Sequence, residues 1–283
     1  MQLNQIPTLD ANRILKDYGL RADKKLGQNF LQDADALIKI CESAEILGTD
    51  SVLEIGPGLG SLTRYLAASS LNLTVVELDS ELLPPLKAIL KPYPNVKIIH
   101  GDILKLNISD LIKTPNYIVA ANIPYNITSA IIRHLLESEN KPRRIVLTIQ
   151  KEVAQRICEK PGDLSLLALS VQVYGEPSLQ AIIPTQAFHP IPKVDSAILR
   201  IDIYEEPLIP NELLNTFFKL IKAGFSQKRK TLRNSLSSGL HISTLDSESM
   251  LNQANIESMR RAETLSIEEW KRLCEIRIAS QPA

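Results

Sequence analysis

The chain has 283 residues, of which 44% are hydrophobic, 23% charged and 5% aromatic, a composition typical of soluble globular proteins. It argues against a disordered or fibrous protein, and the length predicts one large domain, or one large and one small domain. The 32 basic and 32 acidic residues cancel, so the net charge alone gives no sign of a nucleic-acid or membrane partner.

The first 15 residues lack the basic start and the apolar stretch of a signal peptide. No apolar run approaches the roughly 20 residues that a membrane-spanning helix needs. Cys41, Cys158 and Cys274 are odd in number and widely spaced, which argues against a disulfide framework and against a zinc site. We therefore expect a cytoplasmic monomer that binds neither a membrane nor a metal.

From residue 51 onward, short runs rich in β-branched residues alternate with longer mixed segments. Five such runs cover residues 51–56, 73–79, 96–102, 117–125 and 144–150. The runs are apolar throughout, which suits parallel strands buried on both faces, with helices as the crossovers. The sequence therefore predicts an α/β protein with a doubly wound sheet. Residues 164–175 are expected to run from a helix into a strand, and residues 194–204 to add a strand near the sheet edge.

The pattern changes after residue 207. Three segments then show helical spacing: residues 211–225, 228–240 and 265–280. Ser266 stands three residues before Glu269 at the start of the last segment, which predicts a capping box. We place a domain boundary at this change, with an α/β domain at residues 1–207 and a small all-α domain at residues 208–283.

Gly56, Gly58 and Gly60 fall in a turn between a predicted strand and a predicted helix, where an open α/β sheet places its ligand. A dinucleotide fingerprint would need a third glycine at the position of Ser61, so the pyrophosphate-binding pattern is not met. The spacing GxGxG resembles instead the S-adenosylmethionine site of class I methyltransferases. A tight strand-to-helix turn without a ligand would also explain these glycines.

Acidic residues stand at the carboxyl ends of the next two predicted strands. Glu77 is placed to accept hydrogen bonds from both hydroxyls of a ribose, and Asp79 points the same way two residues on. Asp102, after the following strand, is placed to accept a hydrogen bond from an adenine amino group. Solvated loop acids would explain each residue singly, but the ordered series favours a nucleoside-binding pocket.

The fourth predicted strand ends in the sequence Asn-Ile-Pro-Tyr, residues 122–125. The exocyclic amine of adenine is a poor nucleophile because its lone pair is delocalised into the ring. Hydrogen bonds from this amine to the Asn122 side chain and the Ile123 carbonyl would favour a more pyramidal nitrogen. Tyr125 could stack on an extruded base, and Phe188, in a proline-rich loop, could close its other side. An ordinary turn and a core phenylalanine are the alternatives.

Eight segments, in order from about residue 24 to about residue 272, together resemble the bacterial 16S ribosomal RNA adenine dimethyltransferases. The eight segments are residues 24–33, 53–63, 75–79, 101–106, 122–128, 148–157, 188–201 and 225–236. The resemblance implies a Rossmann-like class I methyltransferase with S-adenosylmethionine as cofactor. It implies N6,N6-dimethylation of two adjacent adenosines in the 3′-terminal hairpin loop of small-subunit ribosomal RNA, late in subunit assembly.

The resemblance also implies site residues. The cofactor-binding positions are Asn29, Leu31, Gly56, Glu77, Asp102 and Asn122, to which Gly58 of the same turn is added. Asn122 and Tyr125 match the catalytic motif, and Phe188 matches the aromatic residue that packs on the target base. The N-terminal segment would lie over the site, residues 1–207 would carry catalysis, and residues 208–283 would bind RNA.

Three other functions would also explain parts of this sequence. A 23S ribosomal RNA adenine N6-methyltransferase that confers antibiotic resistance shares the Asn-Ile-Pro-Tyr motif, but residues 193–201 and 225–236 fit the small-subunit family better. A non-catalytic ribosome-assembly or RNA-binding factor would keep the fold without needing intact Asn122 and Tyr125. A nicotinamide oxidoreductase is disfavoured by Ser61 in the glycine turn.

The basic residues are unevenly distributed along the chain. Between Glu212 and Asp246 the sequence contains no acid but six basic residues: Lys219, Lys222, Lys228, Arg229, Lys230 and Arg233. The N-terminal segment carries five more: Arg13, Lys16, Arg21, Lys24 and Lys25. Such clusters suit phosphate contacts, and we expect Lys228, Arg229, Lys230 and Arg233 to bind RNA. A net charge of zero is therefore compatible with a local basic groove.

Overall fold

The computed structural model describes residues 3–280 and groups them into two compact units. The first unit holds the chain up to Ala154 together with Pro177–Ile203, and the second holds Gln155–Glu176 together with the chain from Tyr204 onward. The predicted boundary at residue 207 lies close to Tyr204, but Gln155–Glu176 packs with the helical unit rather than with the α/β unit. The split at residue 207 into a catalytic and an RNA-binding domain stays a prediction.

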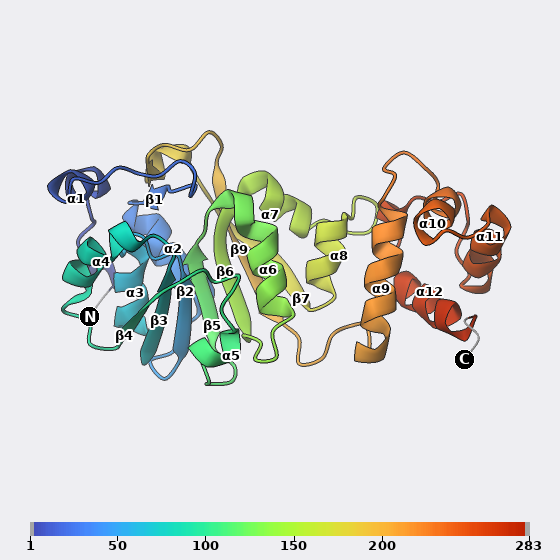
Figure 1. Cartoon of the computed structure of the whole chain (residues 1–283), viewed down its shortest axis with the longest axis horizontal. Helices are drawn as coiled ribbons and strands as arrows, with labels where there is room; N and C mark the ends of the chain where they lie inside the picture. Colours follow the sequence, from blue (N-terminus) through green and yellow to red (C-terminus); the bar gives the residue numbers. More distant parts are fainter. Residues whose placement is uncertain (1–2, 281–283) are drawn as a thin grey trace. The chain divides into compact units, whose positions relative to one another are not determined.

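A seven-stranded sheet forms the centre of the α/β unit (Figure 1). The strands, in sheet order, are β4 (Val96–His100), β3 (Asn72–Glu77), β2 (Ser51–Ile55), β5 (Ile118–Asn122), β6 (Arg144–Gln150), β9 (Ser196–Ile203) and β7 (Gly175–Ile183). The first five are parallel, and β9 runs antiparallel to β6. The predicted strands are confirmed, including the one expected in residues 194–204.

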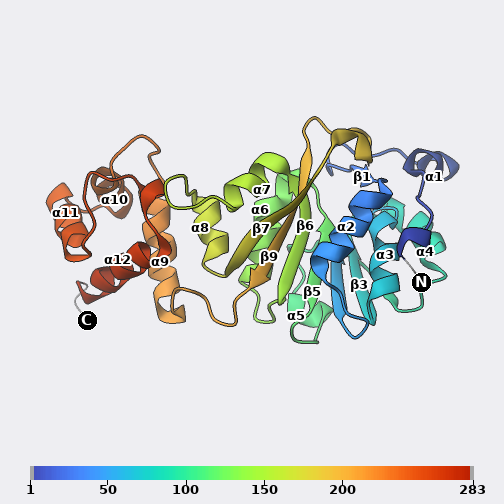
Figure 2. The same cartoon turned by 180° about the vertical axis from the view of Figure 1, so that it is seen from behind.

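Helices cover both faces of the sheet, which confirms the predicted doubly wound class. The helices of this part of the chain are α1 (Ala11–Asp17), α2 (Ala34–Ala44), α3 (Ser61–Ser69), α4 (Leu83–Leu90), α5 (Ile108–Leu111), α6 (Thr128–Leu136) and α7 (Lys151–Ile157). Figure 1 shows α6 in front of the sheet, and Figure 2, from behind, shows α2 and α3 in front of it. Leu37 and Ile40 of α2 are fully buried against the strands.

A second sheet consists of only two strands, β1 (Phe30–Leu31) and β8 (Phe188–His189). The strands are antiparallel, with Leu31 opposite Phe188, and the Gln32 N–H donates to the Ala187 carbonyl at 2.8 Å. This pairing holds the N-terminal segment against the loop that precedes β9. The sequence did not predict it, because two-residue strands have no periodic pattern.

The second unit is helical. Its helices are α8 (Leu166–Gln172), α9 (Asn211–Gly224), α10 (Leu232–Leu240), α11 (Thr244–Gln253) and α12 (Ile267–Ala279). Trp270 is fully buried, and a Cβ atom on Gly224 would stand 2.7 Å from its ring, so α9 and α12 meet closely at this glycine. The predicted capping box of Ser266 and Glu269 is confirmed at the start of α12.

The helix predicted for residues 228–240 begins later than expected, at Leu232. The first amides of α10 bond to a remote loop: Leu232 N–H donates to the Arg260 carbonyl at 2.7 Å, and Arg233 N–H to the Ser258 carbonyl at 3.2 Å. These bonds set the helix start, so residues 228–230 lie in an exposed loop. Within residues 3–280, no helix is both long and apolar enough to span a membrane.

Candidate functional site

The glycine turn joins β2 to α3 and lines a pocket at the carboxyl ends of the parallel strands. Gly56, Gly58 and Gly60 have φ angles of 68°, 57° and 85°, in the left-handed region that favours glycine. A Cβ atom on Gly58 would stand 3.0 Å from the ring of Phe30. A Cβ atom on Gly56 would meet nothing within 4 Å, because this residue faces open space in the pocket. Because glycine has no side chain, the backbone of the turn is accessible to a ligand in the pocket.

Glu77, the last residue of β3, is only 5% exposed, and two backbone amides hold its carboxylate. The Gly58 N–H donates to Oε2 at 2.9 Å, and the Asp79 N–H donates to Oε1 at 2.8 Å. Burial raises the pKa of Glu77, and these amide donors oppose the rise. The carboxylate therefore has a fixed orientation at the pocket wall, and each oxygen retains a lone pair for a ligand.

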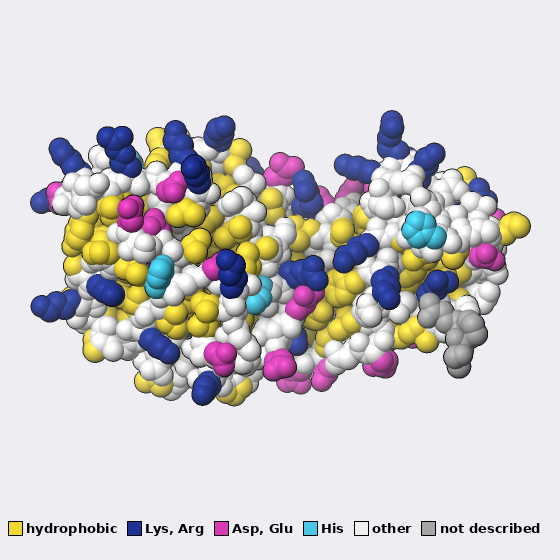
Figure 3. Space-filling view, viewed as in Figure 1, with side chains coloured by type: hydrophobic (Ala, Val, Ile, Leu, Met, Phe, Trp, Pro, Cys, Tyr) yellow, Lys and Arg dark blue, Asp and Glu magenta, His cyan; other side chains and the backbone are white. Residues whose placement is uncertain are grey.

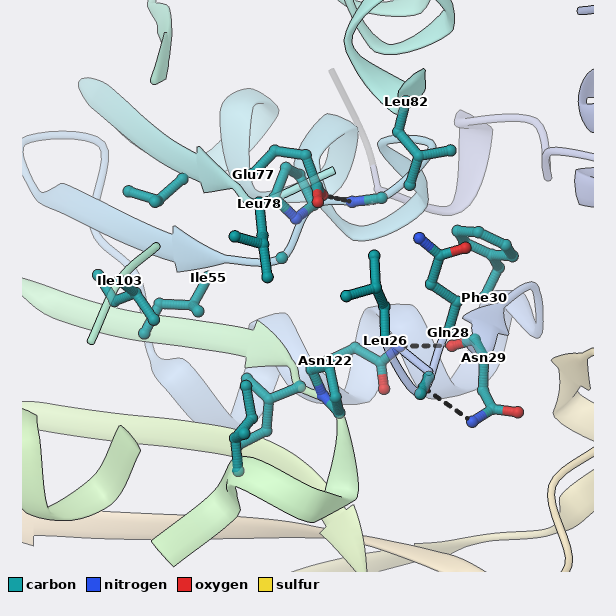
Figure 4. Close-up of a pocket in the computed structure, with 18 of the residues that line it drawn as sticks. Leu26, Gln28, Asn29, Phe30, Ile55, Glu77, Leu78, Leu82, Ile103 and Asn122 are labelled. Atoms are coloured by element: carbon teal, nitrogen blue, oxygen red, sulfur yellow. Dashed lines mark hydrogen bonds between the residues drawn. The ribbon is translucent and has the colours of Figure 1, made fainter. Parts of the chain in front are cut away.

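The N-terminal segment lies across the pocket from the sheet, as Figure 4 shows for Leu26, Asn29 and Phe30. Leu31 also lines the pocket. Gln28 ties the segment down, since its Nε2 donates to Asp79 Oδ2 at 2.7 Å. Gln28 carries no local sequence signal for this role, because its partner is an acid 51 residues away.

Asp102 follows β4 and lines the pocket next to Ile103. Its Oδ1 accepts a hydrogen bond from the Leu104 N–H at 3.1 Å, which orients the carboxylate. Ile55 and Leu78 extend the apolar part of the pocket wall (Figure 4). An apolar slot with carboxylates at its ends suits the flat base and the hydroxyls of a nucleoside.

Asn122 ends β5 and turns its side chain toward the N-terminal segment (Figure 4). Its Nδ2 donates to the Asn29 carbonyl at 3.0 Å. This bond assigns the two ends of the amide, so Oδ1 is the acceptor end available to a ligand. Ile123 and Pro124, which follow, also line the pocket.

Tyr125 lines the pocket directly after this turn. Its hydroxyl forms a 2.6 Å hydrogen bond with Ser196 Oγ at the start of β9. Burial raises the pKa of Tyr125, the Ser196 bond opposes the rise, and the Asp195 carboxylate adds to it. The phenol is therefore neutral at physiological pH, and its ring is held from the far end. Ser196 is a residue that the sequence analysis missed.

Five of the predicted site residues lie elsewhere. Phe188 is 3% exposed and packs in the core of the α/β unit, so its ring is covered; its role in stacking on a base stays a prediction. Lys228, Arg229 and Lys230 lie in the exposed loop before α10. Arg233 is partly buried and lies 3.2 Å from Glu248, as expected of a structural ion pair.

Glu54 is a second buried acid of the pocket wall that the sequence analysis did not single out. It is 1% exposed, and its Oε2 has no hydrogen-bond partner among residues 3–280. Burial raises the pKa of Glu54 to about 8; the Thr63 hydroxyl opposes the rise, and the Glu77 carboxylate adds to it. An acid between the apolar residues Leu53 and Ile55 of a buried strand was the available signal.

Comparisons with known proteins agree with this geometry. The family model described as ribosomal RNA adenine dimethylase matches residues 19–273. The ribosomal RNA small subunit methyltransferase A of Dehalococcoides mccartyi is 46% identical over 265 residues, 93% of this chain and 91% of that protein. The protein of the same name from Bacillus pumilus is 41% identical over 275 residues, 93% of this chain and 94% of that protein.

Two solved structures share the fold over most of the chain. A dimethyladenosine transferase from Plasmodium falciparum has a TM-score of 0.74 at 25% identity, covering 86% of this chain and 95% of that one. The 23S rRNA methyltransferase ErmE has a TM-score of 0.69 at 29% identity, covering 87% of this chain and 98% of that one. With a family match over residues 19–273 and relatives above 40% identity, the chain belongs to the ribosomal RNA adenine dimethylase family.

Proposed function

We propose that this chain transfers methyl groups from S-adenosylmethionine to two adjacent adenosines in the 3′-terminal hairpin loop of 16S ribosomal RNA. Both would become N6,N6-dimethyladenosine late in small-subunit assembly. The observation that carries the proposal is Asn122, a residue of the pocket wall whose Nδ2 donates to the Asn29 carbonyl, which leaves Oδ1 as the acceptor end of the amide. The protein would act as a cytoplasmic monomer without a metal.

The pocket fits S-adenosylmethionine in its set of donors and acceptors. The Glu77 carboxylate would accept hydrogen bonds from the ribose hydroxyls, and Asp102 would accept one from the adenine amine. The open space over Gly56, with Asn29 and Leu31 opposite, would hold the methionine part. When bound, this cofactor supplies an activated methyl group on a sulfonium that departs as a neutral thioether.

The residues at the end of β5 would prepare the target amine. The Asn122 Oδ1 and the Ile123 carbonyl would accept its two N–H groups and draw its lone pair out of conjugation. No general base is needed before attack, because the amine loses its proton after the new bond has formed. Orientation of the amine therefore carries most of the rate.

Tyr125 would hold the base of the target adenosine. A base must leave its stack before chemistry can reach its edge, and an aromatic ring at the pocket offers it a new stacking partner. The hydrogen bond to Ser196 fixes that ring before the RNA arrives. Room for one methyl group in the same position would allow a second transfer to the same nitrogen.

The competing substrate is large-subunit RNA, as the name of ErmE indicates for that protein. This chain is more similar to the relatives named for the small subunit, at 46% and 41% identity, than to ErmE at 29%. A purely structural assembly factor is disfavoured by the intact pocket, with Glu77, Asn122 and Tyr125 all on its wall.

Mass spectrometry of the modified RNA tests the proposal. The protein, S-adenosylmethionine and small subunits that lack these methyl groups should give N6,N6-dimethyladenosine at two adjacent positions. Asn122→Ala should give no detectable dimethyladenosine in the time that the wild type needs for complete conversion, while still binding the subunit. Methylation of large-subunit RNA alone, or no methylation of either, would overturn the proposal.

A further inference from the structure

The helical unit contains a hollow of about 530 Å³ between α9, α10 and α12. Leu220, Ala223 and Leu240 give it an apolar floor. Gly239 allows α10 to cross α9 closely at the edge of the hollow, since a Cβ atom there would stand 2.6 Å from the Ala223 Cα. The hollow is thus framed by a tight helix crossing, and it has room for a hydrated ionic group.

Three cationic side chains surround this hollow. Lys219 and Lys222 are three residues apart and so share one face of α9, while Arg277 comes from α12. Within the part of the chain that the structure describes, none of the three has an ion-pair partner, and the lining contains no Asp or Glu. Figure 3 shows Lys and Arg side chains gathered over α9 and α12.

The charge around the hollow is of one sign. Three cations with no acid among them make a positive local field, which attracts a negatively charged partner. A guanidinium group matches two phosphate oxygens at once, and a lysine adds a mobile point charge. The hydroxyl side chains of Thr216 and Ser226 supply polar groups at the rim.

We propose that this hollow binds phosphate groups of the ribosomal RNA substrate. The inference rests on the proposed function for the identity of the RNA, but the site itself is separate from the basic loop at residues 228–230. RNA is favoured over an acidic protein segment because its backbone presents successive phosphates, which two lysines one helical turn apart and an arginine on a neighbouring helix can contact together.

The salt dependence of RNA binding tests this site. The probe is protein-free 16S ribosomal RNA without the methyl groups, titrated with the full chain at several salt concentrations. Lys219→Gln/Lys222→Gln should make the slope of log K against log salt shallower by about 1.5, since each phosphate contact contributes about 0.7–0.9. Arg277→Gln should make it shallower by about half that amount.

Lys97→Gln/Lys113→Gln is the matched control, because it removes two exposed lysines of the α/β unit. It should leave the slope at the wild-type value, and all variants should keep the wild-type unfolding temperature. A wild-type slope in both hollow variants would overturn the inference. So would weaker binding to intact subunits with unchanged binding to the protein-free RNA, which would identify an acidic protein as the partner.

The two proposals fail separately. If the wild-type chain dimethylates small-subunit RNA and the hollow variants keep its slope, only the phosphate site is wrong. If the wild-type chain forms no dimethyladenosine but the hollow variants still lower the slope, the proposed function is wrong and the hollow remains a phosphate site.

Discussion

In the α/β unit, the pocket acids Glu54 and Glu77 are 1% and 5% exposed, and Glu77 is held by two backbone amides. In the helical unit, Lys219, Lys222 and residues 228–230 are exposed, and among the described residues none of them forms an ion pair. Buried and oriented groups align a ligand at short range. Exposed cations act over roughly 10 Å and are screened by salt. We therefore expect the pocket to align reacting groups and the helical unit to attract an anionic partner.

The largest expected effect comes from removing the acceptor at the end of β5. Asn122→Ala should slow methyl transfer in a single turnover about 1,000-fold, because the target amine loses its oriented acceptor. Binding of RNA should stay within a few-fold of wild type. Asn72→Ala, an exposed asparagine at the start of β3, is the control. A near-normal rate in Asn122→Ala would show that this side chain does not orient the target amine.

Glu54→Gln tests how a buried acid of the pocket affects the stability of the fold. The usual pKa of this acid is 4.5 and burial raises it to about 8, so between these values the folded state binds more protons than the unfolded state. The free energy of unfolding of the wild type should therefore fall as pH rises through this window. Glu54→Gln should remove that fall. Between pH 5 and pH 8 the free energy of unfolding of the variant should therefore rise relative to the wild type by an amount on the order of 3 kcal/mol.

Urea unfolding at pH 5, 6.5 and 8 measures this difference. Glu81→Gln, an exposed glutamate in the turn before α4, should follow the wild type at every pH. If Glu54→Gln loses stability with pH as steeply as the wild type, another group is responsible for the loss.

A smaller effect is expected for Glu77→Ala. Loss of the carboxylate would remove the proposed acceptors of the ribose hydroxyls, and it leaves the Gly58 and Asp79 amides without their partner. Calorimetric titration with S-adenosylmethionine should show affinity weaker by about 30-fold, or about 2 kcal/mol. Glu81→Ala should bind normally, and unchanged binding in Glu77→Ala would remove this carboxylate from the cofactor site.

The smallest effects distinguish two arginines of the helical unit. Arg229 lies in the exposed loop, whereas Arg233 pairs with Glu248 at 3.2 Å. Arg229→Gln should lower the salt slope of RNA binding by about 0.7–0.9 without changing stability. Arg233→Gln should lower stability by about 0.5 kcal/mol and leave the slope nearly unchanged. The reverse result would support the predicted RNA contact of Arg233, which the ion pair with Glu248 does not test.

The pocket residues were predictable because parallel strands end at one edge of a sheet. Once the strands were located, Gly56, Glu77, Asp102 and Asn122 had to lie near that edge, and all four line the pocket. The start of α10 was not predictable, since its first amides bond to Ser258 and Arg260 in a remote loop. Nor was the covered ring of Phe188, because an isolated aromatic residue has the same local pattern in a core as at a site.

The amino-acid sequence by itself determined the strands, their order along the chain and the residue types at their carboxyl ends. Only the tertiary structure decided which groups meet, namely Gln28 with Asp79 and Tyr125 with Ser196, and which line one hollow, as Arg277 and the lysines of α9 do. Local periodicity reports which face of an element is buried, but not which distant group lies against it. Burial also set the pKa of Glu54, which depends on the surrounding protein and not on its sequence neighbours.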